Sequence, residues 1–436
     1  MVGLPGDGPP RRGLVTRIRR IAVDITPLRA SRDFRLLWFG ELVSETGSFM
    51  GLVALYIQVY RLTHSAFAVG AIGLVQLVPL VGVTVLGSPL IDRIDRRRLL
   101  LVAQTGQAVA SGVLLTVTVI GHPHIVIVYL AAAAIAGLSG FALAVRTAIT
   151  PNLVPESQLP AALTLNQAMF QTSLIVGPAI GGIVVGRFGL AWAYGIDVVS
   201  FVATIGAAAL MSAQPPKRDA TDPETEHAAE TTGWASIVAG FRYLRGKRVL
   251  QSVFIVDLIA MTFGMPRALF PILALTQFHA GPEVVGLLFS AVSVGALTAA
   301  LTAGWVGRVE RQGLAVLVAV AVWGLGIIGF GLAGDQLVVA MVCLAVAGAA
   351  DVVSAVFRGT ILQTTVPDDL RGRLSAVNIV VVTGGPRLGD VEAGVVASLA
   401  SPTVSVITGG LLCVVGVVAL GLAVPSFARY RPGDAT

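Results

Sequence analysis

Apolar residues in this chain come in long runs and do not alternate with polar ones. A run of about 20 apolar residues crosses the hydrocarbon core of a bilayer as a helix, whereas a membrane β-strand shows a period of two. The sequence therefore predicts an all-α membrane protein with twelve transmembrane helices. The predicted spans are residues 36–60, 68–91, 99–120, 124–148, 161–186, 190–212, 249–278, 283–306, 313–333, 336–358, 374–400 and 402–424.

The twelve predicted spans form two sets of six that repeat each other. At a constant offset of 212 residues, five features recur: Arg146 as Arg358, Val154-Pro155 as Val366-Pro367, Asn166 as Asn378, Gly177 as Gly389 and Gly182 as Gly394. At an offset of 216 residues, Glu41 corresponds to Asp257 and Gly70 to Gly286. Two pseudo-symmetric six-helix bundles of this kind are the architecture of a rocker-type transporter, whose site lies between the halves.

The two copies differ in the fifth and eleventh spans. Pro178 in the first copy becomes Asp390 in the second, and Ile180 becomes Glu392. One half thus carries a proline where the other carries carboxylates. We expect the fifth span to serve gating, and the eleventh to serve charge balance or substrate contact.

The composition supports a membrane location. Of the 436 residues, 55% are apolar and only 12% are charged, and the mean hydropathy is +0.84. Soluble domains are far less apolar. Both cysteines, Cys343 and Cys413, lie in apolar runs. No disulfide framework is therefore expected.

Most of the positive charge falls on one side of the predicted membrane. If the N-terminus is cytoplasmic, 26 of the 30 Lys and Arg residues lie on the cytoplasmic side, with Arg146 and Arg358 among them. Cytoplasmic loops of membrane proteins carry such an excess. The net charge of +6 is therefore interpreted as a topology determinant and not as a nucleic-acid surface. Both termini of this multi-pass protein are predicted on the cytoplasmic side of the cytoplasmic (inner) membrane.

The predicted organisation has five parts: a basic cytoplasmic N-terminus without a cleaved signal peptide (1–35), an N-terminal bundle (36–212), a cytoplasmic linker (213–248), a C-terminal bundle (249–424) and a cytoplasmic tail (425–436). The linker is acidic and contains prolines up to residue 235, which favours a flexible segment. Ile237, Phe241 and Leu244 then follow at helical spacing among basic residues. This pattern indicates either an amphipathic helix on the inner membrane surface or a solvated lead-in to the seventh span.

Two motifs give the chain a family resemblance. Asp92-Arg93-x-x-Arg96-Arg97-Arg98 follows the second span, and Gly177-Pro178-x-x-Gly181-Gly182 lies in the fifth. Together they resemble the major facilitator superfamily, and the second resembles its drug:proton antiporter signature. Ser88 and Asp95 depart from the loop motif, which has glycine at both positions.

The order of further motifs is similar to the branch that contains the enterobactin exporter and macrolide-efflux proteins. These motifs are His64-Ser65 before Val69-Gly70, Ala191-Trp192-x-Tyr194-Gly195, and Ala239-Gly240-Phe241-Arg242-Tyr243-Leu244. The resemblance implies the major facilitator fold, a small-molecule substrate, protons as the coupling ion, and a cavity lined by the first and seventh helices.

The resemblance also implies gating roles for both motifs. Asp92, Arg93, Arg96 and Arg97 would form a conformational latch on the inner face, because a carboxylate and cations can bind helix ends. The alternative is that these arginines are only topology charges. In the fifth span, Gly177, Pro178, Gly181 and Gly182 would seal the two halves against ion leak. Close helix packing without a directional role is the alternative.

Carboxylates inside the spans are candidates for proton coupling, since each is costly in hydrocarbon unless it is protonated, paired or facing water. Glu41 and Glu45 share one face of the first helix, and Asp257 is the repeat partner of Glu41 in the seventh. We expect these three to meet near the midplane. The alternative is that they pair with arginines at the inner face and only hold structure.

Five further charged residues lie in the later spans. Arg387 and Asp390 are three residues apart, so they are expected either to neutralise each other or to serve the site. Glu392 and Asp351 remain as candidates facing the bundle. Arg267 is expected to bind an anionic substrate or to extend to the outer interface.

No catalytic constellation is present in the sequence. A phosphate loop is absent, the histidines fall in loops or at span ends, and no metal-ligand set is complete. We therefore predict a transporter and not an enzyme, with no cofactor and no metal, working as a monomer. The favoured function is proton-coupled export of an amphipathic small molecule, a siderophore or a hydrophobic drug. The alternatives are an importer of the same fold and a non-transporting membrane scaffold or sensor.

Overall fold

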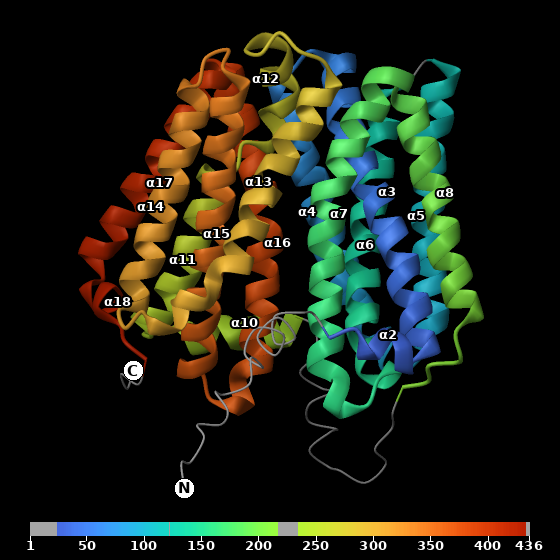
Figure 1. The fold of residues 1–436 in the computed structure, drawn as a ribbon, viewed down its shortest axis with the longest axis horizontal. Coiled ribbons are helices and arrows are strands. Elements are labelled where there is room, and N and C mark those ends of the chain that lie inside the picture. Colours follow the sequence, from blue (N-terminus) through green and yellow to red (C-terminus); the bar gives the residue numbers. More distant parts are fainter. Residues whose placement is uncertain (1–23, 122, 217–233, 433–436) are drawn as a thin grey trace, which may run out of the picture.

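The computed structural model describes residues 24–121, 123–216 and 234–432, and these form two helical bundles side by side (Figure 1). Parts of the predicted N-terminus, linker and tail lie outside the described residues. Within these described ranges, eleven helical segments are long and apolar enough to cross a membrane, and a further 32-residue helix, α16, runs beside them. The fold is therefore the predicted all-α membrane architecture, with a helix at each of the twelve predicted spans.

The described part of the N-terminal half contains six long helices, which follow the short helix α2 (Thr26–Ala30). They are α3 (Arg32–Thr63), α4 (Ala66–Ile91), α5 (Arg96–Ile120), α6 (Ile125–Leu153), α7 (Leu159–Phe188, after η1, Glu156–Gln158) and α8 (Leu190–Leu210). Polar caps set several of their starts: Ser31, Ser65 and Asp95 each accept a hydrogen bond from a backbone N–H in the first turn of α3, α4 and α5. Gly189, at φ +91°, makes the tight turn between α7 and α8.

The C-terminal half repeats this arrangement. Its elements are α10 (Trp234–Leu244), α11 (Arg248–Phe263), η2 (Arg267–Leu269), α12 (Phe270–Thr276), α13 (Pro282–Thr302), η3 (Ala303–Arg308), α14 (Gln312–Leu332), α15 (Leu337–Thr365), α16 (Asp368–Leu399), α17 (Pro402–Ala423) and α18 (Pro425–Arg429). The seventh span is broken between α11 and α12, because Pro266 has no N–H to continue the helix. This break places Arg267 in the middle of the span.

The predicted amphipathic segment forms α10. Its Leu244 is buried against Leu250 and Phe254 of α11, while Phe241 is half exposed. The side chain of Ile237 lies outside the described residues. In Figure 1, α10 lies near the same end of the molecule as α2 and α18.

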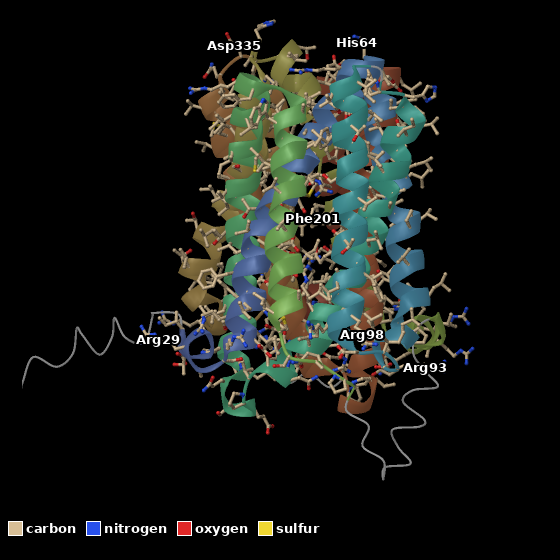
Figure 2. The ribbon with its side chains drawn as sticks, turned by 90° about the vertical axis from the view of Figure 1, so that its right-hand side faces the viewer. Arg29, His64, Arg93, Arg98, Phe201 and Asp335 are labelled. Carbon is tan, nitrogen blue, oxygen red and sulfur yellow. The ribbon has the colours of Figure 1, made fainter. Side chains whose placement is uncertain are left out.

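Arginines mark one end of the molecule. Arg29, Arg93 and Arg98 all lie at that end, which we call the arginine-rich end, and His64 and Asp335 lie at the opposite end (Figure 2). Large apolar side chains such as Leu86 and Leu301 are more than three-quarters exposed along the helices. A surface of this kind fits lipid as its solvent.

The hydrophobic core divides differently at the two ends. One large cluster contains residues of both halves, including Tyr56 and Val69 from the first and Phe289 and Ala393 from the second. Two smaller clusters lie towards the arginine-rich end. One contains only N-half residues and the other only C-half residues. The large cluster extends in the C-terminal half to Phe427 of α18, near the arginine-rich end, but its N-half residues all lie remote from that end. The halves therefore share a core only at the end remote from the arginines.

Candidate functional site

The N-terminal half holds a buried cluster of two carboxyl groups and one guanidinium. Arg146 of α6 forms an ion pair through Nη1 with Glu41, and its Nη2 lies 2.7 Å from Oε1 of Glu45. Gln104 of α5 donates to Oε1 of Glu41 at 3.1 Å. Glu41 is only 2% exposed, whereas the side chain of Glu45 is 21% exposed. Glu45 is thus the member of the cluster that solvent or substrate reaches first.

The C-terminal half holds a similar cluster. Arg358 of α15 forms an ion pair through Nη1 with Asp257 of α11, and its Nη2 lies 3.7 Å from Oδ1 of Asp351. Asp257 is buried, and the side chain of Asp351 is one-third exposed. Here too, one arginine forms ion pairs with one buried and one accessible carboxyl group.

The sequence repeat relates these two clusters. Glu41 lies nine residues after the start of α3, and Asp257 nine after the start of α11. Arg146 and Arg358 each lie seven residues before the end of their helices. Both arginines were predicted near the cytoplasmic ends of their spans. They lie further inside the bundle than predicted, because α6 and α15 continue to Leu153 and Thr365.

The clusters stay separate. Among the described residues, no ion pair joins Glu41 or Glu45 to the C-terminal half. The expected meeting of Glu41, Glu45 and Asp257 is therefore not seen, and each carboxylate pairs with an arginine of its own half. The second carboxyl groups also break the symmetry: Glu45 comes from α3, whereas Asp351 comes from α15, the helix of its own arginine.

A third cluster joins the halves. The hydroxyl of Tyr56 in α3 donates to Oδ2 of Asp390 in α16 at 2.7 Å, and Nη2 of Arg267 lies 3.5 Å from the same oxygen. Asp390 is fully buried. The alternative that Asp390 pairs with Arg387 was wrong for the described residues, since Arg387 donates instead to the backbone oxygen of Thr383 at 2.9 Å. Arg267 also does not extend to the interface, because the helix break turns it inward.

Glu392 takes no part in any of these clusters. It lies two residues after Asp390 on α16 and is only partly buried. No ion pair or hydrogen bond to its carboxyl group is present within the described ranges. The helical rotation of about 200° over two residues explains its separation from Asp390.

The two halves approach most closely through glycines. A Cβ atom on Gly182 of α7 would lie 3.0 Å from Cα of Gly286 in α13, and one on Gly70 of α4 would lie 2.9 Å from Cα of Gly394 in α16. These two contacts are repeat images of each other. Both lie in the parts of their helices remote from the arginine-rich end. Only glycine allows backbones to pack this closely.

The glycine-proline motif of the fifth span faces two neighbours. Gly177 and Gly181 pack against α3, where a Cβ on Gly181 would lie 2.9 Å from Cα of Met50. Pro178 has no N–H to donate to the backbone oxygen of Leu174, one turn before it. The next backbone oxygen, on Ile175, accepts a hydrogen bond of 2.7 Å from Ser290 of α13. The motif thus contributes to contact between the halves.

Two arginines of the loop motif, at the start of α5, contact backbone oxygens near the C-terminal ends of two helices of their own half. Arg96 donates to the backbone oxygen of Ala148 in α6 at 2.9 Å, and Arg97 donates to that of Ala208 in α8 at 2.8 Å. Cations are favourable at such carbonyl ends. Asp92 and Arg93 are exposed at the surface. The part of the motif held in place is therefore Arg96 and Arg97.

A model of the transmembrane secretion effector family matches residues 22–431. The chain belongs to this family of the major facilitator superfamily. It is 25% identical over 411 residues to the enterobactin exporter of Citrobacter koseri, covering 94% of this chain and 96% of the relative. It is 26% identical over 412 residues to that of Shigella boydii serotype 18, with the same coverage.

Solved structures show the same fold. The nucleoside transporter NupG superposes with a TM-score of 0.69 at 13% identity, covering 92% of this chain and 100% of that one. A bacterial homologue of the human lysosomal transporter Spinster, in an inward-facing and unoccupied conformation, superposes with a TM-score of 0.70 at 13% identity, covering 92% and 99%. Membership of the family makes the chain a multi-pass membrane transporter and not an enzyme.

Sequence reasoning missed the partners of the candidate carboxylates. Arg146 and Arg358 were assigned to topology, although their recurrence at the same offset as other repeated residues was the available signal. Tyr56 gave no signal, since nothing in a lone aromatic residue of an apolar span indicates a hydrogen bond to the other half. Asp197, near the start of the sixth predicted span, was not among the predicted candidates, and it is 4% exposed in the interior of the first half.

Proposed function

We propose that this transporter exports an amphipathic small molecule across the cytoplasmic membrane in exchange for protons. The observation that carries the proposal is the pair of buried clusters, Glu41–Glu45–Arg146 and Asp257–Asp351–Arg358, each with two carboxyl groups for one guanidinium. One carboxyl group in each cluster therefore lacks its own cation. Inside a membrane such a group is stable only when it is protonated or meets another cation.

The two excess carboxyl groups are the accessible ones, Glu45 and Asp351. A proton bound at Glu45 leaves Arg146 fully paired with Glu41, and its release restores a net negative charge to the cluster. Charge in each half thus changes with proton occupancy. Because a charged cluster prefers water, this change biases the halves towards one conformation or the other.

The division of the core supports alternating access. The halves share a core and the glycine contacts at the end remote from the arginines, and they keep separate cores at the arginine-rich end. By the positive-inside rule the arginine-rich end and both termini are cytoplasmic. The conformation then corresponds to a state closed to the outside, and one chain contains both halves, which favours a monomer as the working unit.

The substrate class rests on similarity. The relatives at 25–26% identity are enterobactin exporters, which supports a siderophore or a hydrophobic drug of similar character. In the third cluster, the positive charges of Arg267 and Arg387 exceed the single negative charge of Asp390. This excess favours a substrate that carries acidic or phenolic oxygen atoms.

The test uses the full chain in inside-out proteoliposomes with an acidic lumen. Uptake of labelled enterobactin or of a macrolide that is abolished by a protonophore, and by Glu45→Gln, is the expected result. Glu156→Gln, at an exposed carboxyl group on η1, is the matched control and should transport normally. Loss of preloaded compound under the same gradient would favour the importer. Absence of flux of both compounds in either direction would contradict the proposed export of a siderophore or hydrophobic drug.

A further inference from the structure

Asp197 is a buried carboxyl group that the proposed site does not use. It lies in α8, and its residue is 4% exposed. Its Oδ2 accepts a hydrogen bond of 2.6 Å from Ser111 of α5, and its Oδ1 accepts one of 3.3 Å from Ser48 of α3. In the part of the chain that the structure describes, no Lys, Arg or His forms an ion pair with it.

The first helix makes room for this side chain. A Cβ atom on Gly51 of α3 would lie 3.0 Å from Oδ2 of Asp197, and one on Gly47 would lie 3.3 Å from its Cα. Two glycines one turn apart thus form a recess that an alanine at Gly51 would fill. The carboxyl group and its two hydroxyl partners, one from each neighbouring helix, form a built polar site within apolar surroundings.

The ionisable groups around Asp197 do not supply a positive charge. Glu45 lies one turn before Ser48 on α3, and α5 contributes the hydroxyl of Ser111. On α8 itself, Tyr194 directs its hydroxyl to Oε1 of Gln58 at 2.7 Å and away from Asp197. A carboxylate with only hydroxyl partners in a membrane interior is strongly disfavoured against its protonated form. The geometry therefore suits a carboxyl group that holds a proton.

We propose that Asp197 is a second proton-binding residue of the N-terminal half, in addition to Glu45, and that the hydroxyls of Ser48 and Ser111 hold its carboxyl group in place. The proposal rests on the proton-coupled function above, and Ser48 and Ser111 are positioning residues.

The first experiment needs no substrate. Infrared spectra of the purified, reconstituted protein at neutral pH should show a carbonyl-stretch band of a protonated carboxylic acid that Asp197→Asn removes and Glu156→Gln keeps. If Asp197→Asn leaves the band unchanged, Asp197 does not hold a proton in this state and the proposal is overturned. Asparagine keeps the size and the hydrogen-bonding capacity of the site, so folding is expected to persist.

The second experiment separates this proposal from the proposed function. In proteoliposomes, Asp197→Asn should lose enterobactin accumulation driven by a pH gradient but keep exchange of labelled for unlabelled enterobactin without a gradient. Ser48→Ala, which keeps the carboxyl group, should lower gradient-driven accumulation in the same way. Accumulation by both variants at the wild-type level would overturn the role of Asp197. A wild-type protein that exchanges enterobactin but ignores the gradient would overturn proton coupling itself, whatever the infrared result.

Discussion

Removing Arg146 alone should destabilise the protein more than removing all the charges of its cluster. In Arg146→Met, Glu41 and Glu45 remain one turn apart on α3 without a cation, and Glu41 is almost fully buried. Breaking a buried ion pair by deleting one partner costs about 3–5 kcal/mol. Replacing the whole cluster by neutral residues, as in Glu41→Gln/Glu45→Gln/Arg146→Met, is expected to be close to neutral or stabilising.

The assay is thermal unfolding of the purified protein in detergent. In a domain of about 150–250 residues, the size of one half of this chain, each kcal/mol of lost stability lowers Tm by roughly 2–4 °C. The single variant should therefore melt about 10 °C below wild type. The triple variant should melt near wild type, although both lose gradient-driven transport. Arg98→Met, at an exposed arginine on the same end of the molecule, is the control.

The stability of Arg146→Met should also depend on pH. Without Arg146, the buried carboxyl groups are more easily neutralised in the folded state than in the unfolded chain, so the folded state binds more protons. The stability of the single variant should therefore rise as the pH falls, and the difference between its melting temperature and that of wild type should decrease. A single variant that melts with wild type at neutral pH would refute the reasoning, because it would mean that both carboxyl groups are already neutral and need no cation.

Three further outcomes are expected. Gly70→Val should abolish transport without loss of membrane insertion, because its side chain would collide with the partner glycine of α16, whereas Gly82→Val in the same helix has open space and should transport normally. Tyr56→Phe removes a hydrogen bond of about 1.5–3 kcal/mol between the halves, and it should raise the population open at the His64 end by roughly 10- to 150-fold, as measured by spin-label distances across that end. Tyr60→Phe, one turn further along α3, is the matched control and should leave those distances unchanged. Asp92→Asn should reduce transport without a change in melting temperature, since the residue is exposed here; full transport by that variant would remove its role as a latch.

The sequence predicted the fold well because its signal is carried by length and composition. Twelve apolar runs and a repeat at constant offsets are sufficient for twelve helices in two related bundles, and the structure has a helix at each predicted span. The ends were less accurate. The continuation of α6 to Leu153 could not be inferred from hydropathy, because its last turns contain the polar residues Arg146, Thr147 and Thr150.

The candidate site was predicted only as a set of residues. Glu41, Glu45 and Asp257 were identified because a carboxylate in an apolar run is conspicuous, but their partners depend on how helices pack. Arg267 and Arg387 illustrate the limit. Sequence spacing favoured a pair between Arg387 and Asp390, and the break at Pro266 instead brings Arg267 to that carboxylate. Interhelical contacts of this kind are decided by tertiary structure and leave no local pattern.

The two glycine contacts between the halves are equivalent by the sequence repeat, but the polar side chains near them are not. Gly70–Gly394 and Gly286–Gly182 are one contact made twice, so an imagined hybrid of two N-terminal halves would keep both places of close approach. The same hybrid would have Pro178 where Asp390 stands and could not form the hydrogen bond from Tyr56 that spans the halves. Duplication alone thus supplies both glycine contacts between the halves. The divergence of α16 from α7 supplies the hydrogen bond that joins the halves beside them.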